Sequence, residues 1–248
     1  MKNTKKILLC CLCVLLIVAG TVLATLAYLT DQSSVKNTFT VGKVDIKVDE
    51  SDVDEKGEIE TDPSTGETLP RVEENDYHLL PGETYVKDPT MTVQKGSEDS
   101  YVRMILTIHN NDAVKAIIDN PIHGLTDYAD LLGGWDQETW NYIGFTEDTV
   151  NNTISFEFRY KQIVPASDED QVLEPLFTSL IVPATLSGDE LASLYGSSDT
   201  PGDFAMTIEG HAIQATGFAD NAETGATAED AAWAAFDVQM ELEKQNNG

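Results

Sequence analysis

The chain has 248 residues, 43 of them acidic and 15 basic, and its formal net charge is −28 at pH 7. A field of this sign repels phosphate groups and anionic lipids, which excludes nucleic acid as a natural partner. The three cysteines all lie within residues 10–13, so the remainder of the chain has no disulfide, no cysteine nucleophile and no thiolate metal site.

Residues 1–27 are predicted to form a secretory signal peptide. Three lysines precede an apolar run from Ile7 to Leu26, and small residues close the run, which is the order of an export signal. We place cleavage between Ala27 and Tyr28, with a cut after Ala24 as a second option. Loss of the three lysines changes the formal charge to −31.

An uncleaved membrane anchor is the alternative interpretation of the same run. Its roughly 20 residues are enough to span a hydrocarbon core of about 30 Å. With or without cleavage, the basic end stays inside the cell and everything from Asp31 onward lies outside. We therefore expect a protein that is secreted into the extracellular matrix or held at the cell surface, with residues 28–248 forming one domain.

Four later segments alternate apolar and polar residues with the two-residue period of a half-buried strand. They are Val44 to Val48, Tyr101 to His109, Ile154 to Tyr160 and Phe204 to Ile208. Helical patterns are fewer and lie between or after these strands. This order predicts the all-β class, as an antiparallel β-sandwich with a few short helices.

Three helices are predicted. Ser187 can cap a short helix that ends at Gly196, and Thr227 with Asp230 can cap a longer one. The second helix carries Trp233, Phe236 and Met240 on one stripe. A weaker pattern predicts a third helix from Thr126 to Leu132.

Residues 49–70 are predicted to form an exposed acidic loop or hairpin tip, because eight of residues 49–62 are acidic and little in the segment can be buried. An EF-hand is excluded, since its fifth and twelfth positions would be Lys56 and Pro63. Weak surface calcium binding at residues 49–62 or 167–170 is one interpretation of these charges. Solvated charge that confers solubility is the other.

Catalytic chemistry finds little support in the sequence. Its four histidines are isolated and form no His-Glu-x-x-His motif, so we predict no catalytic, cofactor-binding or metal-ligating residue and interpret each histidine as a turn or strand-surface residue. These histidines are His78, His109, His123 and His211. A group of aromatic residues could form a carbohydrate platform or close the end of a core; its members are Trp135, Trp140, Tyr142 and Phe145.

Several segments resemble the TasA/camelysin (CalY) family of Gram-positive bacteria. The resemblance begins with Gly20 to Asp31 and with Asn-Thr-Phe-Thr-Val-Gly-Lys-Val-Asp-Ile-Lys-Val at residues 37–48, and it continues at residues 80–84, 87–93, 96–103 and 212–218. It implies a jelly-roll-like sandwich, export through a dedicated SipW-type signal peptidase, and polymerisation into fibres of the biofilm matrix.

The resemblance also implies that the new N-terminus can act as a donor strand for a neighbouring copy. Val35, Phe39 and Val41 are the apolar candidates, and their spacing puts them on one strand face. The alternative is that this segment is the first strand of a closed monomer. Assembly should be promoted by salt, calcium or low pH, because screening or protonation reduces repulsion between acidic copies.

We therefore expect a secreted structural protein whose partners are copies of itself and other matrix proteins. Two alternatives remain at this point. Camelysin-like relatives are described as metallopeptidases, which would make the chain a surface protease, and the sandwich alone could serve as a monomeric adhesin or binding module.

Overall fold

The computed structural model describes residues 30–34, 37–40, 44–197, 200–201 and 204–247. The predicted signal peptide 1–27, with its cleavage position between Ala27 and Tyr28, lies outside these residues, as do Val35 and Val41. In the described part of the chain, no helix is both long enough and apolar enough to cross a membrane.

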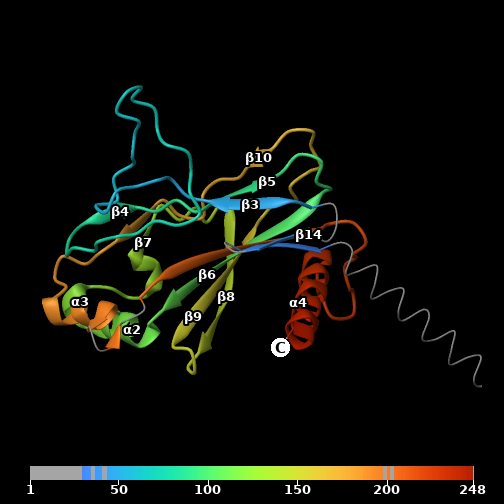
Figure 1. Cartoon of the computed structure of the whole chain (residues 1–248). Coiled ribbons are helices and arrows are strands. Elements are labelled where there is room, and N and C mark those ends of the chain that lie inside the picture. The colour runs from blue at the N-terminus through green and yellow to red at the C-terminus, as the bar shows by residue number, and fades with distance from the viewer. Residues whose placement is uncertain (1–29, 35–36, 41–43, 198–199, 202–203, 248) are drawn as a thin grey trace, which may run out of the picture.

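Antiparallel strands dominate the described residues (Figure 1). The strands are β1 (Thr30–Ser34), β2 (Asn37–Thr40), β3 (Ile46–Asp49), β4 (Thr84–Val86), β5 (Thr90–Val93), β6 (Ser100–His109), β7 (Leu132–Gly133), β8 (Trp140–Asp148), β9 (Thr153–Tyr160), β10 (Gln171–Val172), β11 (Ser179–Ile181), β12 (Gly196–Ser197), β13 (Thr200–Pro201) and β14 (Met206–Gln214). The helices are α2 (Asn111–Asp119), α3 (Gly188–Tyr195) and α4 (Ala228–Asn247), with 3-10 turns η1 (Pro121–His123) and η2 (Tyr128–Leu131).

One large sheet and three smaller ones organise these strands. The large sheet has the order β2-β1-β14-β6-β9-β8, two three-stranded sheets have the orders β10-β5-β3 and β4-β11-β7, and β12 pairs with β13. The pairs between the described strands are antiparallel. The predicted all-β class and antiparallel arrangement are confirmed, and the jelly-roll connectivity stays a prediction.

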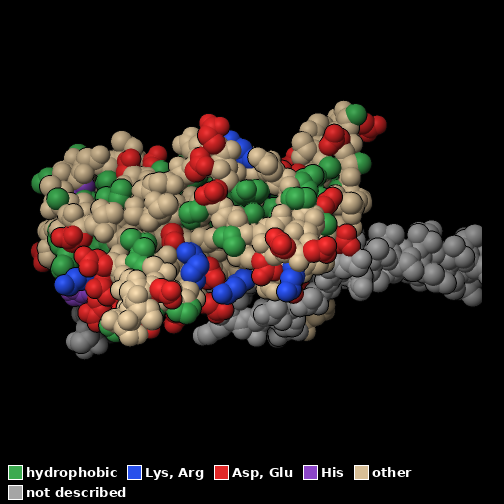
Figure 2. Space-filling view, turned by 90° about the horizontal axis from the view of Figure 1, so that it is seen from above, with side chains coloured by type: hydrophobic (Ala, Val, Ile, Leu, Met, Phe, Trp, Pro, Cys, Tyr) green, Lys and Arg blue, Asp and Glu red, His purple; other side chains and the backbone are tan. Residues whose placement is uncertain are grey.

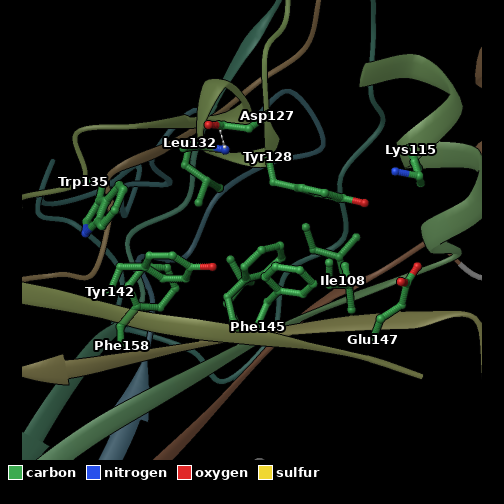
Figure 3. A pocket seen from close by; sticks show the side chains of 14 residues that line it. Ile108, Lys115, Asp127, Tyr128, Leu132, Trp135, Tyr142, Phe145, Glu147 and Phe158 are labelled. Carbon is green, nitrogen blue, oxygen red and sulfur yellow. Dashed lines mark hydrogen bonds between the residues drawn. The ribbon is translucent and has the colours of Figure 1, made fainter. Parts of the chain in front are cut away.

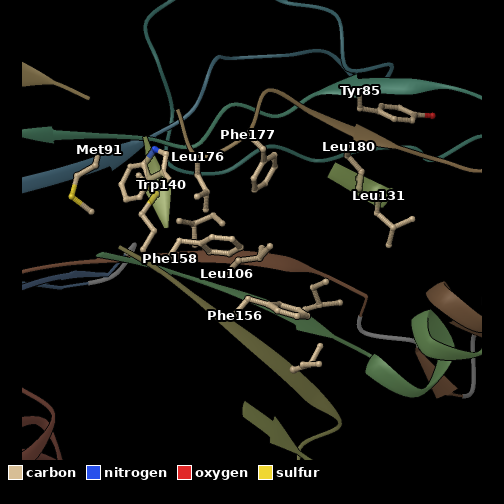
Figure 4. Close-up of a cluster of buried hydrophobic side chains, with 14 of the residues drawn as sticks. Tyr85, Met91, Leu106, Leu131, Trp140, Phe156, Phe158, Leu176, Phe177 and Leu180 are labelled. Carbon is tan, nitrogen blue, oxygen red and sulfur yellow. The ribbon is translucent and has the colours of Figure 1, made fainter. Parts of the chain in front are cut away.

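The inner face of the large sheet follows from the alternation in the sequence. The four alternate residues from Val102 to Ile108 on β6 are each exposed by 1 % or less, and Ile154 and Phe158 on β9 are also buried. They pack against buried residues of the smaller sheets, which lie on the other side of the core. Figure 4 shows Leu106, Phe156 and Phe158 of the large sheet across the core from Met91, Leu176 and Phe177.

The two layers approach each other closely at Gly210 on β14. A Cβ atom at this position would clash with Val48 Cγ2 of β3 and with Met91 Cε of β5. Since a packed core has no spare volume at such a contact, glycine is the residue that lets the small sheet lie directly over β14.

The outer face of the large sheet carries α4, which forms a second, smaller core there (Figure 1). Trp233 and Phe236 are each 1 % exposed and pack with Ile213 of β14. Before the helix begins, Thr227 Oγ1 donates a hydrogen bond to Asp230, and the Asp230 backbone N–H donates to Thr227 Oγ1 over 3.1 Å. This reciprocal cap confirms the predicted start of the helix.

The other helix predictions had mixed outcomes. The helix predicted after Ser187 is present as α3, whereas the segment 126–132 forms only the short 3-10 turn η2. The sequence analysis did not predict α2. This helix follows Asn110, whose φ of 56° is left-handed, and it buries Val114 and Ile117 on one side.

Residues 49–70 rise from the body of the domain as a loose hairpin, which we call the acidic excursion (Figure 1). Isolated bridges pair Val53 with Ile59 and Thr61 with Thr68, and most side chains between them are exposed, as predicted. Its base is different, because Asp49 and Glu50 are 7 % and 5 % exposed. Figure 2 shows that Asp and Glu side chains are spread over the face of the molecule seen there, with Lys and Arg in a few places.

Candidate functional site

The first candidate site is the edge of the large sheet beside β14. Strand β6 pairs with β14 along nine residues, whereas β1 pairs with the other side of β14 only from Gly210 to Ile213. Strand β2 then pairs with β1, from Asn37 to Thr40. Strands β1 and β2, which we call the N-terminal hairpin, therefore end the sheet on this side.

The N-terminal hairpin has a polar sequence. Among its described residues 30–34 and 37–40, Phe39 is the one apolar residue. A segment of this composition gains little from apolar burial, so we infer that the ladder of backbone hydrogen bonds to β14 supplies most of its attachment.

The predicted donor-strand residues are only partly placed by the structure. The backbone of Phe39 lies opposite Gln32 within the hairpin, while Val35 and Val41 lie outside the described residues. The pairing of β1 with β14 of the same chain is the arrangement expected for a closed monomer. A strand donated by another copy would make the same contacts with β14. The pairing within one chain therefore does not distinguish the two arrangements, and strand donation stays a prediction.

A buried network supports the part of β14 that receives β1. Arg103 Nε on β6 donates a hydrogen bond to Nδ1 of His211 over 3.0 Å, and the Arg103 guanidinium pairs with Asp237 of α4. The same guanidinium carbon lies 4.5 Å from the ring centroid of Trp233. Burial lowers the pKa of His211, so the imidazole is held neutral beside the arginine.

His211 corrects the prediction that each histidine lies in a turn or on a strand surface, because it is a buried residue of β14, whereas His123 does lie in a turn, η1, with a buried side chain. His211 is 6 % exposed, and the His123 side chain is fully buried beside Glu190, with 2.9 Å between His123 Nε2 and Glu190 Oε1. Hydrogen bonds from Ser187 and from His123 lower the pKa of Glu190 to about 2. This cluster ties η1 to α3, which is a structural role.

No group of three or more His, Cys, Asp or Glu side chains within the described ranges is arranged to hold a metal ion. The weak calcium binding predicted for residues 49–62 or 167–170 stays a prediction. Asp62 at the tip of the excursion and Asp170 are already engaged, since Asp62 accepts hydrogen bonds from Ser64 and Asp170 accepts one from the Lys95 backbone.

The second candidate site is an aromatic groove between the end of the large sheet and the segment around η2 (Figure 3). It is a cavity of about 470 Å³. Its aromatic lining consists of Tyr128, Trp135, Tyr142, Phe145, Phe156 and Phe158. Phe145 is 61 % exposed and Tyr142 41 %, and large aromatic side chains left exposed together commonly mark a binding site.

A bulge in β8 creates this lining. The pairing of β8 with β9 shifts between Tyr142 and Gly144, so that Tyr142 lies opposite Phe158 and Phe145 lies opposite Phe156. Ile143 is the extra residue. Because strict alternation would place residues 142 and 145 on opposite faces, the bulge is what brings both onto the inner face.

The sequence analysis identified part of this groove. Of the four aromatic residues proposed as a carbohydrate platform or as the end of a core, Trp135, Tyr142 and Phe145 line the groove. Trp140 instead is fully buried, and its Nε1 donates a hydrogen bond to the Glu174 carbonyl over 3.0 Å. The groove residues that the sequence analysis missed are Tyr128, Phe156, Phe158, Lys115, Asp127 and Glu147.

Comparison with known proteins gives no relative: no protein family, no curated protein and no solved structure matches the chain.

Proposed function

We propose that the chain is a secreted, non-enzymatic protein of the extracellular matrix or cell surface that assembles into fibres by donating its N-terminal hairpin to the β14 edge of a second copy. One observation carries this proposal. The edge of β14 from Gly210 to Ile213 is completed by a segment from the opposite end of the chain. The equivalent segment of a second copy offers the same backbone donors and acceptors, so the same ladder can form between chains.

Exchange of this kind leads to fibres. Each copy gives its hairpin and receives one at β14, so addition is head to tail and does not close on itself. In the sequence, the hairpin is joined to the rest of the domain by residues 41–43.

The polar composition of the hairpin favours exchange. An incoming strand has to replace backbone hydrogen bonds, whose net contribution is about 1 kcal/mol each, and Phe39 is the one large apolar residue in the described sequence of the hairpin. Because the same ladder serves both arrangements, a higher protein concentration shifts the balance toward the intermolecular one.

A disulfide at the β1–β14 pairing tests the proposal directly. The chain from Tyr28 onward has no cysteine, and Asp31 lies opposite Ala212. We expect the double variant Asp31→Cys with Ala212→Cys to stay monomeric when it is oxidised at low protein concentration. After reduction and concentration it should form fibres in negative-stain electron microscopy.

Oxidation of the same variant at high concentration provides the complementary measurement. We expect a ladder of disulfide-linked oligomers on a denaturing gel, with the two single-cysteine variants as controls that cannot form it. Fibres formed equally well by the oxidised monomer would disprove hairpin exchange. Casein cleavage that a chelator abolishes would instead favour the peptidase alternative.

A further inference from the structure

The aromatic groove lies away from the N-terminal hairpin, at the β8 side of the large sheet, and the proposed assembly does not use it. Its floor is apolar and comes from Leu106, Ile108 and Ile154 of the inner face. Figure 3 shows Tyr128 facing Phe145 and Ile108 across the groove, with Trp135 at one end and Lys115 and Glu147 at the other.

The aromatic rings form one connected wall. Trp135 lies 5.4 Å from Phe158, Tyr142 lies 5.6 Å from Phe158, and Phe145 lies 6.2 Å from Phe156, measured between ring centroids. The negative faces of aromatic rings attract a cation, and this attraction strengthens as the cation loses water.

The charges around the groove are mainly negative. Two carboxylates, Asp127 and Glu147, and one ammonium group, Lys115, line it. Lys115 already faces Asp119, whose carboxylate is 3.8 Å from its Nζ. Each carboxylate accepts a hydrogen bond, from the Ala129 backbone and from Asn111 respectively, and retains further acceptor capacity.

The carboxylates near the polar end of the groove act on Tyr128. Its pKa is raised by burial and, in addition, by the carboxylates of Glu147, Asp119 and Asp112. The negative field therefore extends to the polar end of the groove, and the formal charge of the whole chain has the same sign.

Three ligand classes fit these features poorly. Anions are repelled by the field. Sugars need several convergent hydrogen-bonding groups, whereas this lining is predominantly aromatic and aliphatic. Neutral apolar molecules would gain from burial and nothing from the carboxylates.

We propose that the aromatic groove is a binding site for a small apolar cation, a quaternary or tertiary ammonium ion, with its alkyl groups against the rings of Tyr128, Phe145 and Phe156 and its charge toward Glu147. The lining gives such an ion both apolar contact and cation–π attraction. The same ammonium group could also be presented by a lipid headgroup, and we assign the site to the free ion because a groove of about 470 Å³ has the size of a small-molecule site.

A pair of matched probes tests the charge preference. Choline and 3,3-dimethylbutan-1-ol have the same shape, and only choline carries a charge. Titration of residues 28–248, which contain every described residue, can be followed by tryptophan fluorescence, because Trp135 lines the groove while Trp140 and Trp233 are buried elsewhere. We expect choline to bind about tenfold more tightly than the alcohol at low salt.

Three variants assign the effect to the groove. Phe145→Ala should weaken choline binding about tenfold, and Glu147→Gln should weaken choline binding while leaving the alcohol unchanged. Lys115→Gln should strengthen choline binding, because it removes the opposing charge. Val172→Ala, at a residue that is 69 % exposed on β10 in another sheet, is the control and should change neither affinity.

Several outcomes would overturn the proposal: no binding of choline by a chain whose circular dichroism spectrum shows it folded, equal affinity for the alcohol, or weaker choline binding by Lys115→Gln. Co-sedimentation with phosphatidylcholine vesicles, without binding of free choline, would overturn the assignment to a free ion. None of these results depends on fibre formation, so the proposed function is tested separately.

Discussion

At the scale of single residues, His211 links the large sheet to α4 through a charge-sensitive contact. Its ring lies 4.8 Å from the ring of Phe236 between centroids, and its Nδ1 accepts the hydrogen bond from Arg103. A proton on this imidazole would remove the acceptor and place a second positive charge beside the guanidinium. The fold therefore favours the neutral form, with burial as the main cause.

This predicts that the domain loses stability as the pH falls below the ordinary histidine range. Above pH 6.5 His211 is neutral in both the folded and the unfolded chain, whereas below it the unfolded chain binds a proton that the folded chain resists. The loss between pH 6.5 and pH 5 is limited to about 2 kcal/mol for one proton.

Urea denaturation at pH 7 and pH 5 measures this loss. The variant His211→Asn should show a smaller fall in the free energy of unfolding than the native sequence. His78→Gln, at an exposed histidine, should behave like the native sequence. An identical pH dependence in all three proteins would contradict the role given to His211.

At the scale of elements, α4 is held by its own cap, by its own small core, and by ion pairs that join Asp237 to Arg103 and Asp230 to Arg159. The backbone N–H of Thr227 donates to the Asp230 carboxylate and the backbone N–H of Asp230 donates to Thr227 Oγ1, so two backbone groups at the start of the helix are satisfied. The apolar contacts of Trp233 and Phe236 belong to a cluster separate from the main core. We infer that α4 can detach while the sandwich stays folded.

Thr227→Ala should accordingly destabilise α4 by about 1 kcal/mol. Native-state hydrogen exchange should show amides of α4 exchanging about fivefold faster, with amides of β6 unchanged. Thr149→Ala, in an exposed turn after β8, is the matched control. Equal acceleration in α4 and β6 would mean that the helix and the sandwich unfold together.

The elements differ in how well the sequence predicts them. Strands β6 and β9 and helix α4 were predictable because burial of one face leaves a clear period in the sequence. Strands β1 and β2 carry no such pattern, since one apolar residue in nine gives no alternation, and their place in the sheet is seen only from the backbone pairing of β1 with β14 and of β2 with β1. Helix α2 has a helical signal in the spacing of Val114, Ile117 and Ile118, which are buried on one side of it.

The lining of the aromatic groove could be predicted from the sequence only in part. The aromatic residues of β8 were noticed in the sequence, but the bulge at Ile143 decides which of them share a face. A bulge depends on the pairing with β9 and not on the local sequence. Tyr128 and Phe156 also line the groove, and they meet through tertiary packing between segments 28 residues apart. The periodicity of a local sequence cannot predict such a contact.

At the scale of the whole molecule, the formal charge of −31 for residues 28–248 governs how copies approach each other. The distance over which charges act falls from about 30 Å at 0.01 M salt to about 8 Å at 0.15 M. Fibre formation through the N-terminal hairpin should therefore be slower at low salt, and calcium or moderate acid should act in the same direction as salt.

Light scattering at 10 mM and 150 mM salt measures this effect. We expect a shorter lag before fibre growth at the higher salt concentration, and no fibres at either concentration from a chain that lacks residues 28–41. Growth that is independent of ionic strength would contradict the proposed role of charge repulsion. Growth of fibres from the chain that lacks residues 28–41 would contradict the proposed role of the N-terminal hairpin.

The acidic excursion offers a position at which residues can be inserted into the chain. Arg71 clamps its base, with Arg71 Nε 2.6 Å from Asp49 Oδ1 and Nη1 2.9 Å from Asp88 Oδ2, whereas its far end, around Thr65 and Gly66, is exposed. Lengthening a loop beyond a fixed base costs little, because the entropy of closure grows only slowly with length. The tip is thus the position where extra residues, an affinity tag or an epitope among them, can be inserted while the core, the β14 edge and the groove keep their structure.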